Sequence, residues 1–360
     1  MQDLSVLYSE IQDLPDSLAQ VALIKEGIRL ADQLNDDKYS LIFRDLLIDN
    51  AAYSGIYSDM RDALSAFSWK IAYFDRNGRP VRGDLLDLYQ WLCRWIVVYP
   101  EVSKAKLTEI LDDFKRRYSA AGFNLRAYYE ALMVASSIMG DIETAAFAHK
   151  KYNESGHMDS IINCEGCVAC RNIKYYRAIL DHKATMKAME IFKRYGAWCN
   201  MNPKTAWNEA VASAVEAGDF EGKIEGYQQA GYKAISRDAY FLADIGWHIQ
   251  FYAAKDSVKG FNLYKKHLAW TLTPNRFPLS QLYFNLGAAV ILKLVGLKRK
   301  NFKAHFSRQL PFYKEDGVYN FNEVEAHHIE LARGLATRFD CRNGNSFYTE
   351  QVERLYGREY

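Results

Sequence analysis

Proline and glycine are scarce in this sequence of 360 residues, which has 7 Pro and 21 Gly. A chain of many short strands needs frequent Gly and Pro turns, so their scarcity favours helices over a β-rich fold. Neither sign of charge is in excess, because 46 Lys and Arg face 44 Asp and Glu, for a formal net charge of +2. Bulk charge therefore exerts no strong pull toward nucleic acid or an anionic membrane.

Targeting and membrane signals are also missing. The N-terminus lacks the basic and apolar regions of a signal peptide. The longest apolar stretches, such as residues 286–295, are too short to span a bilayer, and this one is interrupted by Lys293. We expect no membrane partner and a cytoplasmic, reducing compartment. Structural disulfides are not expected there, and clustered cysteines become candidates for metal or redox chemistry.

Catalytic signatures are absent as well. The sequence contains no G-x-S-x-G, H-E-x-x-H or P-loop pattern, and the glycines Gly78 and Gly83 are not followed by the Lys-Ser/Thr of a P-loop. Paired carboxylates such as Asp112 and Asp113 fall on an expected solvated helix face, whereas acid–base catalysis requires burial to tune them. We therefore expect a protein that is not an enzyme.

A helical periodicity with a longer repeat runs through much of the chain. Residues 1–35 carry apolar side chains at helical spacing and are predicted to form an N-terminal helical cap. From about residue 36, each unit consists of a helix, a tight turn and a second helix. The turns fall near residues 58, 101, 140, 183, 218 and 255. The interval of roughly 35–43 residues is typical of helical-hairpin solenoids.

These units resemble the tetratricopeptide repeat (TPR). The matching positions are Trp207, Gly218, Asp219 and Tyr227 in one unit, Leu132, Gly140 and Ala145 in another, and Tyr176, Ala188, Phe192 and Pro203 between them. Lys223 and Gly260 depart from the pattern where a small alanine is expected. The resemblance covers residues 36–270 and implies an all-α, right-handed α-solenoid of TPR-like hairpins with helical N- and C-terminal caps. In particular, the chain is similar to uncharacterised bacterial repeat proteins with a Cys-x-x-Cys knuckle before one hairpin, a likeness that implies no established activity.

The last region, residues 271–360, is predicted to form a C-terminal helical cap. Its expected helices cover residues 279–297 and 321–339, with Asn320 and Glu323 placed as in a capping box. The segment 301–319 between them is expected to be a loop with a short helix.

Three cysteines, Cys164, Cys167 and Cys170, form a C-x-x-C-x-x-C motif, a spacing that recurs in zinc sites. Residues 153–169 are expected to be an irregular linker, followed by helices over 172–181 and 185–195. The entry and exit of an antiparallel hairpin lie at the same end, so Cys199 should return beside the motif. We predict a structural Zn²⁺ bound by Cys164, Cys167 and Cys199, with Cys170 or His157 as the fourth ligand. Reduced cysteines without a ligand are the alternative.

Other candidate sites are weaker. Glu323, His327 and His328 share one expected helix but lack further ligands, and we interpret them as ordinary polar residues on a helix surface. We expect His248 and His267 to be core or rim histidines, and the isolated Cys93 and Cys341 to be buried structural cysteines.

A ligand-binding groove is expected on the first helices of the units, which line the concave face of a superhelix. These helices carry aromatic, amide and arginine side chains suited to an extended peptide, although part of them must pack in the core. The groove candidates are Tyr129, Tyr176, Arg177, Trp207, Asn208, Tyr240 and Asn285.

We therefore expect a non-enzymatic scaffold that binds a protein or peptide in its groove and contains structural zinc. The first alternative is a peptide-responsive regulator that acts on a protein partner. A zinc-dependent enzyme is less favoured, as is an RNA-binding protein that uses the basic residues Lys298, Arg299, Lys300 and Lys303. The sequence leaves open the partner, the biological process and the oligomeric state.

Overall fold

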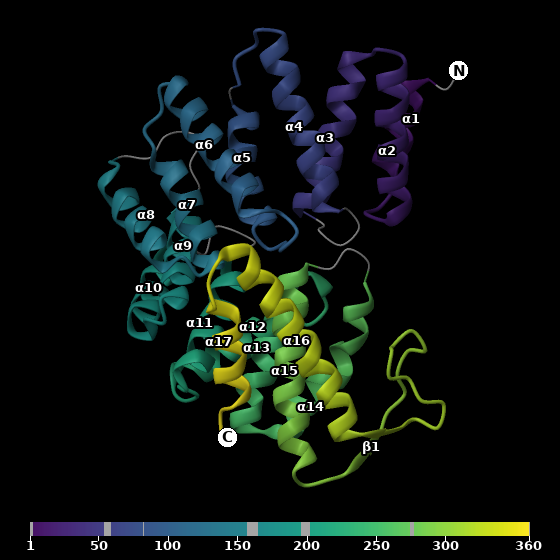
Figure 1. Ribbon diagram of the computed structural model, residues 1–360, viewed down its shortest axis with the longest axis vertical. Coiled ribbons are helices and arrows are strands. Elements are labelled where there is room, and N and C mark those ends of the chain that lie inside the picture. Colours follow the sequence, from purple (N-terminus) through teal and green to yellow (C-terminus); the bar gives the residue numbers. More distant parts are fainter. Residues whose placement is uncertain are drawn as a thin grey trace.

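The computed structural model describes residues 3–53, 59–81, 83–156, 165–195, 202–273 and 277–359. These residues are mostly helical, so the chain is all-α as predicted (Figure 1). The helices are α1 (Leu4–Asp13), α2 (Leu18–Gln33), α3 (Asp37–Tyr53), α4 (Met60–Arg76), α5 (Asp84–Ile96), α6 (Lys104–Ala120), α7 (Arg126–Met139), α8 (Ile142–Glu154), α9 (Glu165–Ala178), α10 (His182–Tyr195), α11 (Asn202–Ala217), α12 (Lys223–Ile235), α13 (Leu242–Lys255), α14 (Ser257–His267), α15 (Pro278–Gly296), α16 (Phe321–Asn343) and α17 (Phe347–Tyr356). Two 3₁₀ helices, η2 (Ala239–Phe241) and η3 (Leu268–Leu272), flank α13 and α14.

Helices that follow one another pack as pairs, among them α5 with α6, α7 with α8, α9 with α10 and α11 with α12. In addition, each odd-numbered helix from α3 to α15 packs against the next odd-numbered helix. We call these helices the first-helix row. In Figure 1 the row curves from α3 at the top, through α7 and α9 at the left, to α13 and α15 below.

The Gly140-Asp141 turn ends one helix and caps the next. Gly140 ends α7 with a left-handed φ of 69°, which glycine adopts without steric cost. Asp141 then caps α8, because its Oδ1 accepts a hydrogen bond from the Thr144 amide at 3.1 Å. Gly218 ends α11 in the same way, with a φ of 76°, but Asp219 does not cap α12, whose N-cap is Gly222.

Two large apolar cores, with a smaller cluster between α7, α8 and α9, hold the array together. The first includes buried residues of α1 to α7, and the second extends from α9 to α17. Phe277, at the start of α15, belongs to the first core although it follows α14 in the chain. Tyr240 packs against both. The two halves of the chain therefore meet around η2 and the N-terminus of α15.

The C-terminal helices α16 and α17 pack on α15 and lie in front of α11 to α15 in Figure 1. The turn between them also contacts the first half of the chain. Asn345 donates from Nδ2 to the Met139 carbonyl at 2.8 Å, and Lys104 donates to the Asn343 carbonyl at 3.1 Å. This hairpin thus ties α16 to the ends of α6 and α7.

α15 is long and apolar enough to cross a membrane by length and composition alone, the single such helix in the described residues. The most apolar part of this helix is 67% buried between neighbouring helices. α13 and α16 pack on two of its sides. A core position therefore accounts for its composition.

Two features near the start of α16 differ from the sequence prediction. Residues 301–319, expected to be a loop with a short helix, contain an antiparallel pair of strands, β1 (Asn301–Lys303) and β2 (Val318–Asn320). Phe302 and Tyr319 face each other across this pair and bury their rings, with ring centroids 5.5 Å apart. Asn320 caps α16 as predicted, but the Glu323 carboxylate pairs with Lys314 at 2.7 Å instead of completing a capping box.

Candidate functional site

Charged side chains lie along the first-helix row on five successive helices. These helices are α5, α7, α9, α11 and α13, which pack side by side in that order. We call this set the charged row, and its members are Arg94, Glu130, Arg171, Lys174, Arg177, Glu209 and Asp244. Arg171, Lys174 and Arg177 are three residues apart, so they share one face of α9.

At one end of the charged row, two arginines share one carboxylate. The Glu130 Oε1 atom lies 3.2 Å from the Arg171 Nε and 3.7 Å from the nearer Arg94 nitrogen. The three side chains are 2%, 13% and 9% exposed, respectively. Burial, followed by the charge of Arg171, lowers the pKa of Arg94 to about 10 in spite of Glu130. Two guanidinium groups thus share the Glu130 carboxylate, and Asp87 and Cys167 act on Arg94 in the same direction as Glu130.

Tyr240 and Trp95 complete this end of the row. The Trp95 and Tyr240 rings meet edge to face with centroids 5.7 Å apart, and Phe277 packs against both. Burial raises the pKa of Tyr240 well above its ordinary value, while the charges of Arg171 and Arg94 act in the opposite direction. We call Arg94, Trp95, Glu130, Arg171 and Tyr240 the Arg94 cluster.

The middle of the charged row is better balanced. Arg177 donates from Nε to Glu209, and the Lys174 ammonium lies 3.6 Å from the same carboxylate. Although burial opposes the effect, these two cations lower the pKa of Glu209. The Arg177 guanidinium also lies 5.7 Å from the ring of Trp247, within range of a cation–π contact.

Asp244 on α13 ends the row with a carboxyl group that titrates near neutrality. Burial, followed by the negative charge of Glu209, raises the pKa of Asp244 to about 7. Lys174 and Arg177 act in the opposite direction and do not cancel the effect. The charge of the row therefore changes around neutral pH.

The cysteine motif begins on the same helix as the three basic residues. Cys167 and Cys170 lie within α9, which begins at Glu165, so this part of the motif is helical and not the predicted knuckle. The helix forms earlier than expected because Ala169, Cys170 and Ile173 pack into the second core. Cys170 is fully buried and Cys167 is partly exposed.

The other predicted zinc ligands, His157, Cys164 and Cys199, lie outside the described residues. Within the described part of the chain, no three His, Cys, Asp or Glu side chains gather in a group that could hold a metal ion. Cys93 is buried as predicted, whereas Cys341 is exposed on α16, contrary to prediction.

Five of the predicted groove residues are partly exposed: Tyr129, Tyr176, Arg177, Trp207 and Tyr240. Tyr129 packs against Tyr128, and Tyr176 against Tyr175. The remaining two, Asn208 and Asn285, are buried and therefore do not line the surface of this structure. Their amides bind histidines of neighbouring helices.

These histidines form two buried hydrogen-bond networks. His248 donates from Nε2 to the Asn208 Oδ1 at 2.9 Å, and its Nδ1 accepts from Gln228 at 3.2 Å. His328 donates from Nδ1 to the Asn285 Oδ1 at 2.7 Å, and its Nε2 accepts from the Tyr264 hydroxyl at 3.0 Å. Each imidazole is thus satisfied in its neutral form. The burial of His248 confirms the sequence prediction, while His328 is in the core and not on a helix surface.

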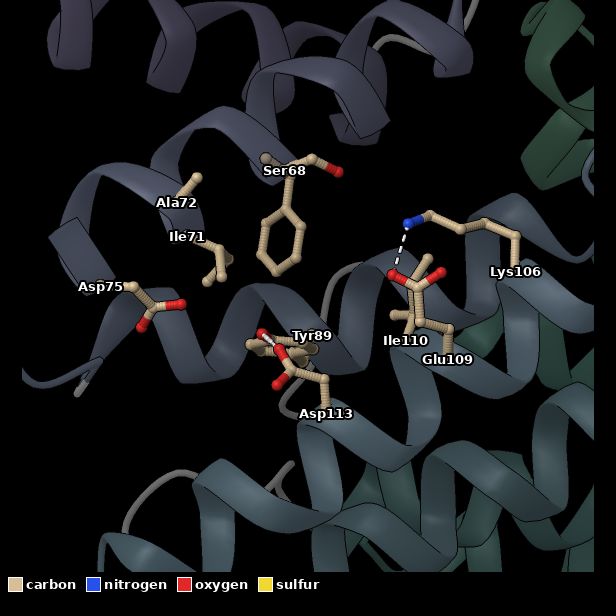
Figure 2. Close-up of a pocket in the computed structure, with 10 residues that line it drawn as sticks. Ser68, Ile71, Ala72, Asp75, Tyr89, Lys106, Glu109, Ile110 and Asp113 are labelled. Atoms are coloured by element: carbon tan, nitrogen blue, oxygen red, sulfur yellow. Dashed lines mark hydrogen bonds and ion pairs between the residues drawn. The ribbon is translucent and has the colours of Figure 1, made fainter.

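A cavity of about 190 Å³ opens between α4 and α6, with α5 beneath it (Figure 2). Phe67, Ile71 and Ile110 contribute apolar walls, and Lys106 and Glu109 pair at one end. The volume is below the roughly 300–1,000 Å³ of pockets that enclose drug-sized ligands.

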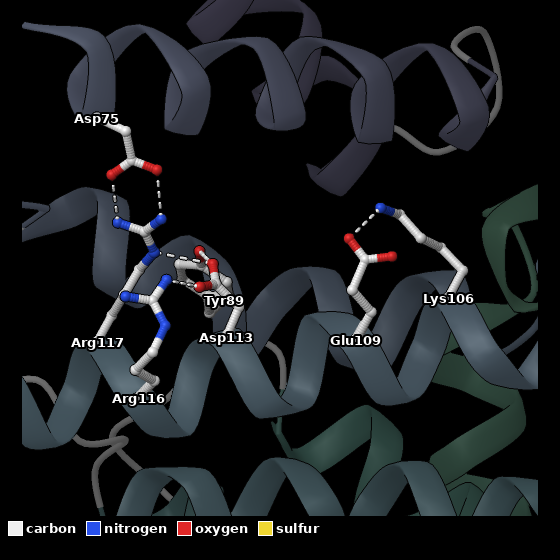
Figure 3. A network of polar contacts seen from close by, with 7 residues as sticks. All are labelled: Asp75, Tyr89, Lys106, Glu109, Asp113, Arg116 and Arg117. Carbon is white, nitrogen blue, oxygen red and sulfur yellow. Dashed lines mark hydrogen bonds and ion pairs between the residues drawn. The ribbon is translucent and has the colours of Figure 1, made fainter.

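At the other end of this cavity, Arg117 joins α4 to α6 (Figure 3). It donates two hydrogen bonds to the Asp75 carboxylate, at 2.7 and 2.8 Å, and one to Asp113 at 2.8 Å. The Tyr89 hydroxyl and Arg116 also donate to Asp113. The polar groups around the cavity are therefore engaged with one another, and we interpret the network as a structural link.

No protein-family model, curated protein or solved structure matches the chain. The candidate site is therefore defined by its own geometry. Of the charged row, sequence reasoning had placed Arg177 in the groove, and it missed Arg94, Arg171, Lys174 and Glu209. The available signal was that side chains of opposite charge occur on successive first helices of the units.

Proposed function

We propose that the helical pairs form a right-handed, TPR-like α-solenoid whose concave face is the first-helix row. Support comes from the ordered packing of the odd-numbered helices and from the Gly-Asp turns that separate paired helices. Such a face spans several units and suits a ligand with many contact points.

The function proposed for this chain is to bind a protein or peptide along the first-helix row, without catalysis. The observation that carries the proposal is the charged row itself. It places cationic, anionic and aromatic groups on five neighbouring helices, and several of them are partly exposed. Charged groups of both signs fix the orientation of a ligand, and rings such as Trp207 offer rigid contact area.

A structural Zn²⁺ bound by Cys164, Cys167 and Cys199, with Cys170 or His157, remains part of the proposal. Two observations on the described residues favour it. Cys167 and Cys170 are three residues apart on α9 and so lie on one side of the helix. Against the effect of burial, the charge of Glu130 and then those of Cys170 and Cys167 raise the pKa of Arg171, and a positive neighbour favours the thiolate form that binds metal. The ion would tie the segment before α9 to the segment after α10.

A peptide selection tests the proposed function. Random peptides are selected by mRNA display against the full chain, and enriched sequences are remeasured by fluorescence anisotropy. The double variant R177Q/E209Q removes one cation and one anion from the charged row and should weaken binding about tenfold or more. The matched variant K106Q/E109Q removes an exposed pair from α6 and should bind like the unmodified chain. Absence of enrichment, or equal effects of the two variants, would count against the proposal.

A further inference from the structure

The Arg94 cluster contains two buried hydrogen-bond donors for which no acceptor is found among the residues that the structure describes. They are the Nη2 of Arg94 and the indole Nε1 of Trp95. A buried donor without an acceptor lowers the stability of the fold, and a charged donor lowers it more. Two neighbouring residues of α5 thus each leave a donor unsatisfied at the point where the two halves of the chain meet.

The two residues that carry these donors both adjoin Tyr240. The Trp95 ring contacts the Tyr240 ring, and the charge of Arg94 acts on the Tyr240 hydroxyl. Arg171 acts on the same hydroxyl from α9. The donors therefore belong to one locus formed by α5, α9 and η2.

The charge of the locus is also incomplete. Two guanidinium groups, of Arg94 and Arg171, share the single carboxylate of Glu130. Among the described residues, Glu130 is the only carboxylate in an ion pair with either guanidinium, while Asp87 and Cys167 act on Arg94 without forming such a pair. Within ion-pair distance the positive charge thus exceeds the negative charge by one, and the burial of Arg94 makes that charge costly.

We propose that the Arg94 cluster binds one carboxylate of an acidic peptide segment lying along the first-helix row. This inference rests on the proposed function and names the ligand chemistry at one end of it. A carboxylate supplies two acceptor oxygens and one negative charge, which match two donors and one surplus positive charge. A neutral acceptor would leave the charge uncompensated, and a phosphate dianion would exceed it. Arginine is suited to this task because its planar group binds carboxylates through two parallel hydrogen bonds.

The first experiment measures binding to the unmodified chain. The indole N–H signal of Trp95 is followed in ¹H–¹⁵N NMR spectra and assigned with the variant W95F. The probes are sodium acetate and the capped peptide acetyl-Glu₄-amide, with acetyl-Gln₄-amide as the neutral counterpart. Acetate and the Glu peptide should shift the Trp95 signal, and the Gln peptide should not.

The second experiment compares variants by fluorescence anisotropy with labelled Glu and Gln peptides. The Glu peptide should bind about tenfold more tightly than the Gln peptide, because charge-assisted hydrogen bonds are stronger than those between neutral groups. R94Q should abolish this preference, R94K should weaken it, and R116Q on α6 should preserve it. If R94Q does not fold, R171Q provides the same test and should also reduce the preference for the Glu peptide.

The outcomes separate this inference from the proposed function. Acetate that shifts the Trp95 signal while neither peptide binds would support the carboxylate site and contradict the peptide groove. Peptides that bind with equal affinity, whether Glu or Gln, and whose binding R177Q/E209Q weakens, would support the groove and overturn the carboxylate site. No shift of the Trp95 signal with acetate or the Glu peptide would overturn the site, since the surplus charge would then be balanced by other groups.

Discussion

Arg342 of α16 donates a hydrogen bond to the carbonyl oxygen of Val97, which follows the last residue of α5, over a distance of 2.8 Å. The same guanidinium also reaches the carbonyls of Tyr99, at 3.2 Å, and Val102, at 3.4 Å. A carbonyl at a helix end has no partner within its own helix, so Arg342 satisfies groups that would otherwise need water. A residue near the C-terminus thereby closes the α5–α6 turn.

The variant R342M tests how much the hydrogen bonds of Arg342 contribute to the stability of the fold. Methionine preserves the apolar stem of the side chain and removes the donors, so we expect a loss of about 3 kcal/mol in the free energy of unfolding, measured with urea. R338A is the control, because Arg338 forms an exposed ion pair with Glu101 one turn earlier, and such pairs contribute less than about 1 kcal/mol. Equal losses for both variants would refute the role given to Arg342.

Gly246 of α13 and Gly287 of α15 allow their helices to meet backbone to backbone. A Cβ atom on Gly246 would overlap the Tyr283 carbonyl, and one on Gly287 would overlap the Gly246 carbonyl. G246A should therefore lower the free energy of unfolding by at least about 2 kcal/mol in urea denaturation. The matched variant G334A, in an open position of α16, should raise it by about 0.5–1 kcal/mol. A neutral G246A would show that α13 and α15 can separate without cost.

Acid should destabilise the fold through three buried histidines. Burial lowers the pKa of His248 and of His328 to about 3, and that of His267 to about 4. The unfolded chain binds protons near pH 6.5 and the folded chain does not, so stability is complete above pH 6.5 and is lost as the pH falls toward 4.

Each histidine should contribute a slope of about 1.4 kcal/mol per pH unit below pH 6. H248Q and H328Q should each reduce the measured slope of unfolding free energy between pH 6 and 5 by that amount. H305Q, at an exposed position, should leave it unchanged. An unchanged slope in H248Q would mean that His248 takes up its proton in the folded chain.

Asp244 should produce the opposite pH dependence. Its pKa is raised to about 7 by burial and by Glu209, above its ordinary value near 3.9. The neutral form is favoured in the folded state, so the stability from Asp244 is complete below pH 3.9 and is lost as the pH rises through 7. D244N should therefore stabilise the chain at pH 8 more than at pH 5. Urea unfolding at both values checks this, and a ¹³C carboxyl titration of Asp244 should have its midpoint near pH 7.

The local features of the fold could be read from the sequence, and the long-range ones could not. Helical spacing and the Gly140-Asp141 turn depend on residues within one or two turns, and both were predicted. The burial of Asn208 and Asn285 depends on His248 and His328, which follow 40 and 43 residues later. No local pattern distinguishes such an amide from one that faces a groove.

The candidate site shows the same contrast between features that depend on local sequence and features that depend on distant residues. Arg177 was predicted because an arginine beside two tyrosines stands out on one helix. Arg94 was missed because its importance depends on Glu130 and Arg171, which follow on two other helices. The start of α9 was missed for another reason: the cysteine spacing outweighed an apolar pattern, Ala169, Cys170 and Ile173, that already indicated a helix.

Metal removal tests the zinc prediction. The purified chain should contain about one zinc, and the variant C164S/C199S should lose it, because a four-ligand site seldom retains the ion after two ligands are replaced. The melting temperature should then fall by several degrees, the shift expected from the loss of roughly 2 kcal/mol in a chain of this size. C341S is the matched control, since Cys341 is exposed on α16 and outside the proposed site. Unchanged metal content and melting temperature in C164S/C199S would remove zinc from the proposal, and the search for function would continue at the charged row.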